Sequence, residues 1–160
     1  MWIDTHCHLD AAEFDEGAAV VASAAQAAGV KLIVIPAVER ANFARCAELG
    51  QTLPNTCYAL GIHPMYVPAA AEVDLQHLRQ AVAAAMPDPR FVAIGEIGLD
   101  YHYDFSPKAV QRDVFRVQLR LARELGRPVI IHTREAEKDT LAILRQEGAE
   151  TTGGVFHCFT

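Results

Sequence analysis

The chain has 160 residues, of which 51% are hydrophobic, so length and composition predict one domain, residues 1–160, with enough apolar material for a core. Its 14 basic and 20 acidic residues give a net charge of −6, which argues against broad binding of nucleic acid through a basic surface. Without a long apolar stretch or CxxC spacing among its four cysteines, the sequence indicates a soluble protein with free thiols in a reducing cytoplasm.

Short apolar runs alternate along the chain with stretches of helical period. The runs predict strands at 2–6, 31–36, 57–61, 91–96, 129–133 and 154–157, and the stretches between them predict helices at 13–28, 42–49, 75–85, 107–125 and 135–146. Pro107 suits the first turn of the 107–125 helix, and Gly126 suits its end. Strict alternation of strand and helix favours a parallel sheet covered by helices.

The spacing of the strands predicts how large the complete fold is. Strand starts at 2 and 154 bracket five repeats of about 30 residues, and eight such units would need roughly 240 residues. The expected fold class is therefore α/β, of the (β/α)₈ TIM-barrel family, with about six of the eight βα units present. Because the sequence stops directly after the sixth strand, we expect the last two units to be missing. A smaller open α/β sheet is the alternative.

Four of the predicted strands carry residue types that bind metals at or directly after their carboxyl ends: His6 and His8, Glu96, His132 and His157. The carboxyl ends of parallel strands meet at one edge of a sheet, so these side chains are expected to converge. His6 and His8 are two residues apart and share one face of a strand, which makes them a chelating pair. Glu96 has two oxygens and can bridge two ions, and two ions activate water for hydrolysis. A satisfied core histidine is the alternative for either His132 or His157 alone.

Other polar residues near these strand ends carry weaker expectations. His63 follows the third strand and either contacts substrate or stabilises its turn, Arg134 could meet a phosphate, and Asp4 could orient a histidine ligand. The arginines of the 107–125 helix are expected to form a solvated face, and His102 has no expected role.

Five segments in order resemble the signature motifs of the TatD family of metal-dependent deoxyribonucleases, and the resemblance covers the whole chain. The segments are 3–10, 61–64, 95–101, 128–134 and 154–159, which read IDTHCHLD, GIHP, GEIGLDY, PVIIHTR and GVFHCF. The resemblance implies a TIM barrel with two divalent ions, such as zinc, magnesium or manganese, that hydrolyses phosphodiester bonds, typically of DNA from a strand end.

Carried over by position, the family's metal ligands fall on the residues already singled out. His6 and His8 match the ligands of one ion, His132 and His157 match those of the other, and Glu96 matches the bridging carboxylate. Asp100 matches the fourth-strand motif and is expected to support the ligands. The family pattern adds an aspartate from a later strand, which this sequence does not reach. We therefore expect weak metal occupancy and little activity from these 160 residues alone.

Three functions remain open on the sequence. The first is a phosphodiesterase acting on DNA, or on another phosphodiester, at a frayed or single-stranded end, without a membrane or an obligate protein partner. The second is a barrel hydrolase of an amide, lactone or other small molecule. Related enzymes of that kind often use a modified lysine on strand four, and Glu96 at that position favours the nuclease-like branch. The third is an inactive metal-binding fragment with exposed sheet edges.

Overall fold

The computed structural model describes residues 1–14, 16–67, 71–103 and 105–157. Within these ranges one parallel sheet has its strands in chain order: β1 (Trp2–Asp4), β2 (Val30–Pro36), β3 (Thr56–Leu60), β4 (Phe91–Asp100), β5 (Val129–Arg134) and β6 (Gly154–His157). The α-helices are α1 (Ala18–Ala27), α2 (Phe43–Thr52), α3 (Ala71–Ala85), α4 (Lys108–Leu125) and α5 (Glu137–Gln146). Short 3₁₀ helices cover Arg40–Asn42, Pro64–Tyr66 and Ala149–Thr151.

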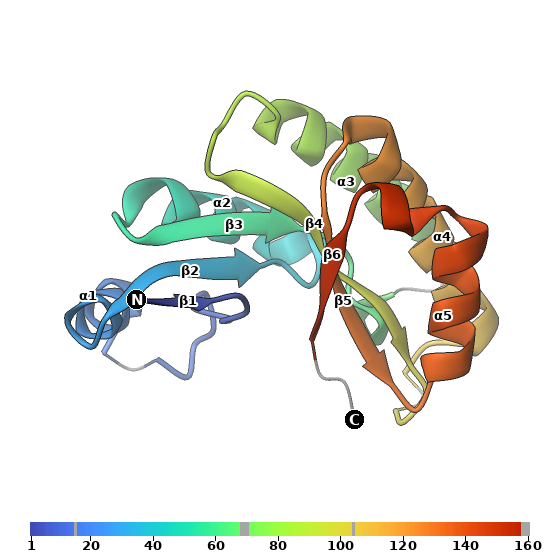
Figure 1. Ribbon diagram of the computed structural model, residues 1–160, viewed down its shortest axis with the longest axis horizontal. Helices are drawn as coiled ribbons and strands as arrows, with labels where there is room; N and C mark the ends of the chain where they lie inside the picture. The colour runs from blue at the N-terminus through green and yellow to red at the C-terminus, as the bar shows by residue number, and fades with distance from the viewer. Residues whose placement is uncertain (15, 68–70, 104, 158–160) are drawn as a thin grey trace.

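The sequential strand order explains the shape of the molecule. Right-handed crossovers place every helix on the same side when each strand is added next to the previous one. Figure 1 shows the result, a sheet that curls into a half-barrel with the helices around its outside. The fold is therefore α/β and barrel-like, as the strand spacing predicts. None of the helices in the described ranges is long and apolar enough to cross a bilayer.

The core lies mainly between the sheet and its helices. Large side chains such as Phe91 and Phe115 are fully buried in this layer. A second, smaller cluster contains Ala59, Ala93 and Ile130. Ala59 lies between Tyr58 and Leu60 of the main cluster, as expected for the alternation of side chains along a strand. Both faces of the central strands are thus buried, which accounts for their nearly continuous apolar sequence.

Two predicted boundaries differ from the structure for local reasons. The helix expected from residue 13 begins at Ala18, because Gly17 precedes it with a φ of 87° that a helix interior does not allow. Strand β4 continues to Asp100 rather than ending at 96. Gly98, with a φ of 138°, lies so close to β5 that a Cβ there would collide with the carbonyl oxygen of His132. This glycine permits close backbone approach within the sheet instead of ending the strand.

The arginines of α4 are more than the solvated face that the sequence predicts. Arg120 donates two hydrogen bonds of 2.8 Å to the carboxylate of Glu147, and Arg116 donates one of 3.1 Å. Arg123 donates to the carbonyl oxygen of the same residue at 2.8 Å. Glu147 follows α5 and is only 6% exposed. These contacts attach the end of α5 to α4. The helical period of α4 could not predict them, because it does not show which residues of another helix lie opposite.

Cys7, Cys46 and Cys57 are free thiols, and Cys158 lies outside the described residues. Burial raises the pKa of the Cys57 thiol to about 11, so this residue stays a neutral thiol at physiological pH.

We expect Glu147→Gln to lower the free energy of unfolding by about 1–3 kcal/mol at pH 7, because it removes a charged acceptor from Arg116 and Arg120. Hydrogen bonds from Arg120 hold the pKa of Glu147 below its ordinary value, against the opposing effect of burial. Stabilisation by a depressed carboxyl pKa is present above the unfolded-state pKa and is lost as the pH falls through the folded-state pKa. Urea denaturation should therefore show a smaller difference between wild type and variant as the pH falls below about 4.

The matched control for this measurement is Glu124→Gln. Glu124 is an exposed residue of α4 whose contact with Arg79 is 3.6 Å long, so its replacement should change stability little. A loss in the Glu147 variant that is equal at pH 7 and pH 3 would contradict the ion-pair interpretation.

Candidate metal centre

Glu96 lies at the centre of a polar cluster that gathers residues from five strands or the segments after them. It is in β4 and 1% exposed, and its backbone N–H donates to the carbonyl oxygen of Ala37 at 2.9 Å. The histidines around it are His6 and His8 after β1, His63 after β3, His132 in β5 and His157 at the end of β6. Glu96 and His132 are therefore within strands rather than at their ends, which corrects the sequence-based placement.

One carboxylate oxygen of Glu96 faces the histidine pair after β1. The Nε2 atoms of His6 and His8 lie 3.1 and 3.4 Å from Glu96 Oε2 and 3.0 Å from each other. The pair belongs to an extended segment beyond β1, not to the strand itself. Two ring nitrogens and a carboxylate oxygen that converge in this way repel one another unless a proton or a cation lies between them. The three atoms therefore form a ready set of metal ligands.

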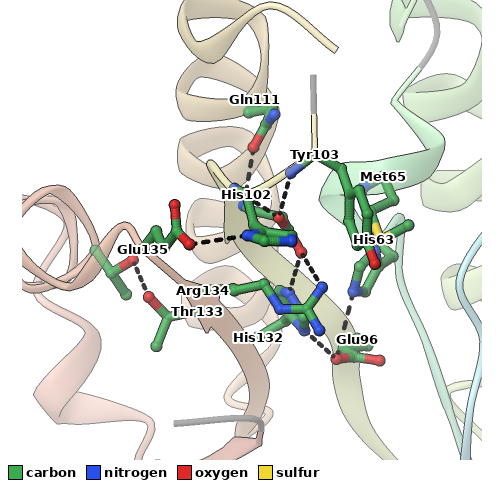
Figure 2. A network of polar contacts seen from close by, with 12 residues as sticks. His63, Met65, Glu96, His102, Tyr103, Gln111, His132, Thr133, Arg134 and Glu135 are labelled. Carbon is green, nitrogen blue, oxygen red and sulfur yellow. Dashed lines mark hydrogen bonds and ion pairs between the residues drawn. The ribbon is translucent and has the colours of Figure 1, made fainter. Parts of the chain in front are cut away.

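The other oxygen of Glu96 faces His132 and His63, and Figure 2 shows both rings directed at this carboxylate. His132 Nδ1 lies 3.1 Å and His63 Nε2 lies 3.5 Å from Glu96 Oε1. A metal ion could be held by this group as well, since its three ligand atoms lie close together. The hydrogen bonds on the far side of each ring, however, give the two histidines different properties.

The far-side partners set which nitrogen of each ring carries a proton. His132 Nε2 lies 2.8 Å from the carboxylate of Asp100, which can only accept, so this nitrogen carries a proton. Nδ1 donates to Glu96 when the ring is protonated and offers a lone pair to a metal ion when the ring is neutral. His63 Nδ1 accepts the backbone N–H of Met65 at 3.1 Å, so its proton is on Nε2. His132 Nδ1 could therefore bind a metal ion, whereas the Nε2 of His63 carries a proton in this arrangement.

The pKa shifts follow from this geometry. Burial by itself raises the pKa of Glu96, but hydrogen bonds from His132, His6, His63 and His8 outweigh burial and hold the pKa far below its ordinary value. The hydrogen bond to Glu96 raises the pKa of His8. For His132, burial favours the neutral ring, but Glu96 and Asp100 together raise its pKa. Burial lowers the pKa of His63, which keeps that ring neutral. The cluster is a site that attracts positive charge.

The remaining predicted residues lie at the edge of this cluster. The ring of His157 stacks on His6, with centroids 3.4 Å apart and planes at 6°, so a role beside His132 remains a prediction. Asp4 Oδ1 accepts the backbone N–H of His6 at 3.0 Å and thus orients the segment rather than the ring. Arg134 Nη1 lies 3.9 Å from Asp100 Oδ2. The phosphate contact expected of Arg134 remains a prediction.

A pocket of about 450 Å³ opens beside the cluster. Its lining includes His8, His63 and Glu96 from the cluster, together with Asp10, Asn42 and Tyr66. A substrate in this pocket would therefore contact two of the cluster histidines and the shared carboxylate directly.

Sequence reasoning missed the residues that border the site on its other side. His102 Nδ1 lies 2.8 Å from Glu135 Oε1, and the guanidinium carbon of Arg134 lies 5.1 Å above the ring of Tyr103. The one local signal was an aromatic and histidine cluster directly after β4, at residues 101–105.

Comparisons with known proteins show which family and which proteins the chain resembles. It matches a family model described as TatD related DNase over residues 3–160. It is 41% identical to the uncharacterized metal-dependent hydrolase YabD of Bacillus subtilis strain 168, over 100% of this chain and 61% of that protein. It is 33% identical to the 3'-5' ssDNA/RNA exonuclease TatD of Edwardsiella piscicida, over 99% of this chain and 60% of that protein.

A solved structure extends the likeness to the fold. The TatD homologue YJJV from Escherichia coli K12 superimposes with a TM-score of 0.88 at 36% identity, over 99% of this chain and 60% of that one. The chain thus spans about 60% of the length of the relatives that it matches.

We expect Glu96→Gln to lower the pKa values of His8 and His132 in the metal-free protein, because the Glu96 carboxylate stabilises both protonated rings and an amide does not. NMR titration of the histidine ring protons after treatment with a chelator measures the effect. Glu135→Gln, which changes an exposed carboxylate beside His102, should leave both titrations unaltered. Unchanged titration of His8 and His132 in the Glu96 variant would contradict the central role of this carboxylate.

Proposed function

Because the chain belongs to the TatD related DNase family, we propose that it forms the larger part of a hydrolase that cleaves phosphodiester bonds of DNA with two divalent ions, such as zinc, magnesium or manganese. The observation that supports this proposal is that the two carboxylate oxygens of Glu96 face different histidines. One of its oxygens faces His6 and His8, and the other faces His132. A carboxylate with separate ligand groups on its two oxygens is suited to bridging two ions.

The residues present fit such ions on chemical grounds. Imidazole nitrogens and a carboxylate oxygen are ligands that suit zinc and related divalent ions. His6 Nε2 lies 3.1 Å from Glu96 Oε2, so it can offer its lone pair to an ion beside this oxygen when the ring proton is on Nδ1. Asp100 fixes the ring of His132 in the orientation of a ligand. His157 is proposed as a further ligand of the ion held by His132.

Divalent ions bound here would supply Lewis-acid activation of water and of a phosphoryl oxygen. The protein's own contribution is positioning and hydrogen bonding. His63 is neutral, lines the pocket and carries its proton on Nε2, so we propose that it donates to a phosphate oxygen or to the leaving group. Arg134 is proposed to bind an adjacent phosphate, because its guanidinium lies at the edge of the same cluster.

Nucleic acid is the proposed substrate, and a single-stranded end is the proposed point of attack. One relative is named as an exonuclease of single-stranded DNA and RNA. The net charge of −6 gives the chain no general electrostatic attraction for a DNA duplex. The positive charge that binds a phosphate is therefore proposed to come from the bound ions and from Arg134. Free thiols favour a reducing cytoplasm as the place of this activity.

We expect His132→Ala and His63→Ala to separate metal binding from catalysis in the protein that contains these 160 residues. His132→Ala should lower the metal content per chain, because it removes a ligand. His63→Ala should keep the metal content and lower the rate of cleavage about 100-fold or more, because it removes a proton donor. Elemental analysis after dialysis and the release of nucleotides from a labelled single strand measure the two effects.

His77→Ala, at a partly buried histidine of α3 that is not part of the cluster, is the matched control and should change neither quantity. Loss of metal in the His63 variant would make His63 a ligand and contradict the assignment from its tautomer. Cleavage by wild type that persists after a chelator has removed all metal would exclude the proposed function.

A further inference from the structure

The loop after β4 exposes two neighbouring aromatic rings. Tyr103 is 41% exposed and Phe105 is 65% exposed, and their rings stack with centroids 5.3 Å apart and planes at 16°. Phe91 and Phe115, by contrast, are almost completely buried. A stacked aromatic pair in water is an unsatisfied apolar surface, and such a surface marks a place where something binds.

Arg134 and Asp100 connect this aromatic pair to the candidate metal ligands. The guanidinium carbon of Arg134 lies 5.1 Å above the Tyr103 ring, and Arg134 Nη1 lies 3.9 Å from the carboxylate of Asp100. The other oxygen of that carboxylate accepts the backbone N–H groups of His102 and Tyr103, at 3.0 and 3.2 Å. Asp100 therefore holds both the ring of His132 and the start of the aromatic loop, and Figure 2 shows Arg134 next to His132.

The combination of an aromatic pair, a guanidinium and a phosphodiesterase site indicates one ligand chemistry. A nucleobase stacks on aromatic rings whatever its sequence, and an adjacent arginine accommodates the phosphate that follows it. A base can stack there only if it has left the duplex. A second protein could also bind an apolar surface of this kind. The guanidinium of Arg134 at its edge, in a chain whose net charge is −6, favours a negatively charged polymer as the ligand.

We propose that Tyr103 and Phe105 form a stacking subsite for an unpaired base next to the cleaved phosphodiester, and that this subsite selects single-stranded nucleic acid. The proposal rests on the proposed phosphodiesterase function and adds the residues that set its strand preference.

The experiment compares binding of two fluorescein-labelled single strands by fluorescence anisotropy, in the protein that contains these residues. Both strands carry phosphorothioate linkages against cleavage, and one has abasic residues in place of the bases at its 3' end. Wild type should bind the intact strand about fivefold or more tightly than the abasic strand. The double variant Tyr103→Ala/Phe105→Ala should bind both strands with the weaker affinity.

Matched variants separate stacking from other effects. Tyr103→Phe keeps both rings and should bind as wild type does, whereas Phe105→Leu keeps an apolar side chain without a ring and should lose much of the discrimination. Trp2→Ala, at the 72% exposed residue that begins β1, tests whether any exposed aromatic residue matters, and it should leave binding unchanged. Thermal unfolding should be unaltered in all variants, because the replaced side chains are exposed.

The outcomes distinguish this inference from the proposed function. The stacking subsite is overturned if the double variant and Phe105→Leu both prefer the intact strand over the abasic strand as strongly as wild type does. This holds even if metal-dependent cleavage is intact. Loss of discrimination in the ring-free variants, in a protein that cleaves no phosphodiester with any metal, would support the subsite and overturn the hydrolase.

Discussion

The structure depends on the burial of one charged carboxylate. Glu96 is 1% exposed in the middle of β4, where an isolated negative charge would be very costly. Four histidine nitrogens within 3.5 Å compensate it, and they arrive from β1, β3 and β5 or the segments that follow these strands. The same constraint that makes the carboxylate tolerable brings together a set of metal ligands. Stability of the site and its chemistry therefore have a common origin.

Glycine makes this gathering possible. A Cβ at Gly61 would lie 2.7 Å from the backbone of Gly95, and one at Gly95 would lie 2.6 Å from the Cβ of Ile130. The backbones of the central strands β3, β4 and β5 thus approach one another closely next to Glu96. The register between β4 and β5 also shifts between Ile94 and Ile97, on either side of the carboxylate. One of the irregularities of the sheet therefore lies at the site, as is common for functional positions.

Asp100 links the ligand cluster to its surroundings. It accepts the ring proton of His132, and its backbone N–H donates to the buried side chain of Gln111 in α4 at 3.0 Å. Its second oxygen receives the backbone of the loop that carries the exposed aromatic pair. Asp100 therefore connects the ring of His132 and the start of the loop through its carboxylate, and α4 through its backbone N–H.

The sequence by itself determined the kinds of residue, their order and the alternation that produces a barrel-like parallel sheet, because periodicity and ligand chemistry are local properties. It also identified Glu96, His6, His8 and His132 as candidate ligands. Only the tertiary structure decided that the two oxygens of Glu96 face different histidines, that His63 carries its proton on Nε2, and that α4 arginines meet Glu147. These facts are distances and hydrogen bonds between residues remote in the chain, and they depend on strand register and curl, which no local pattern records.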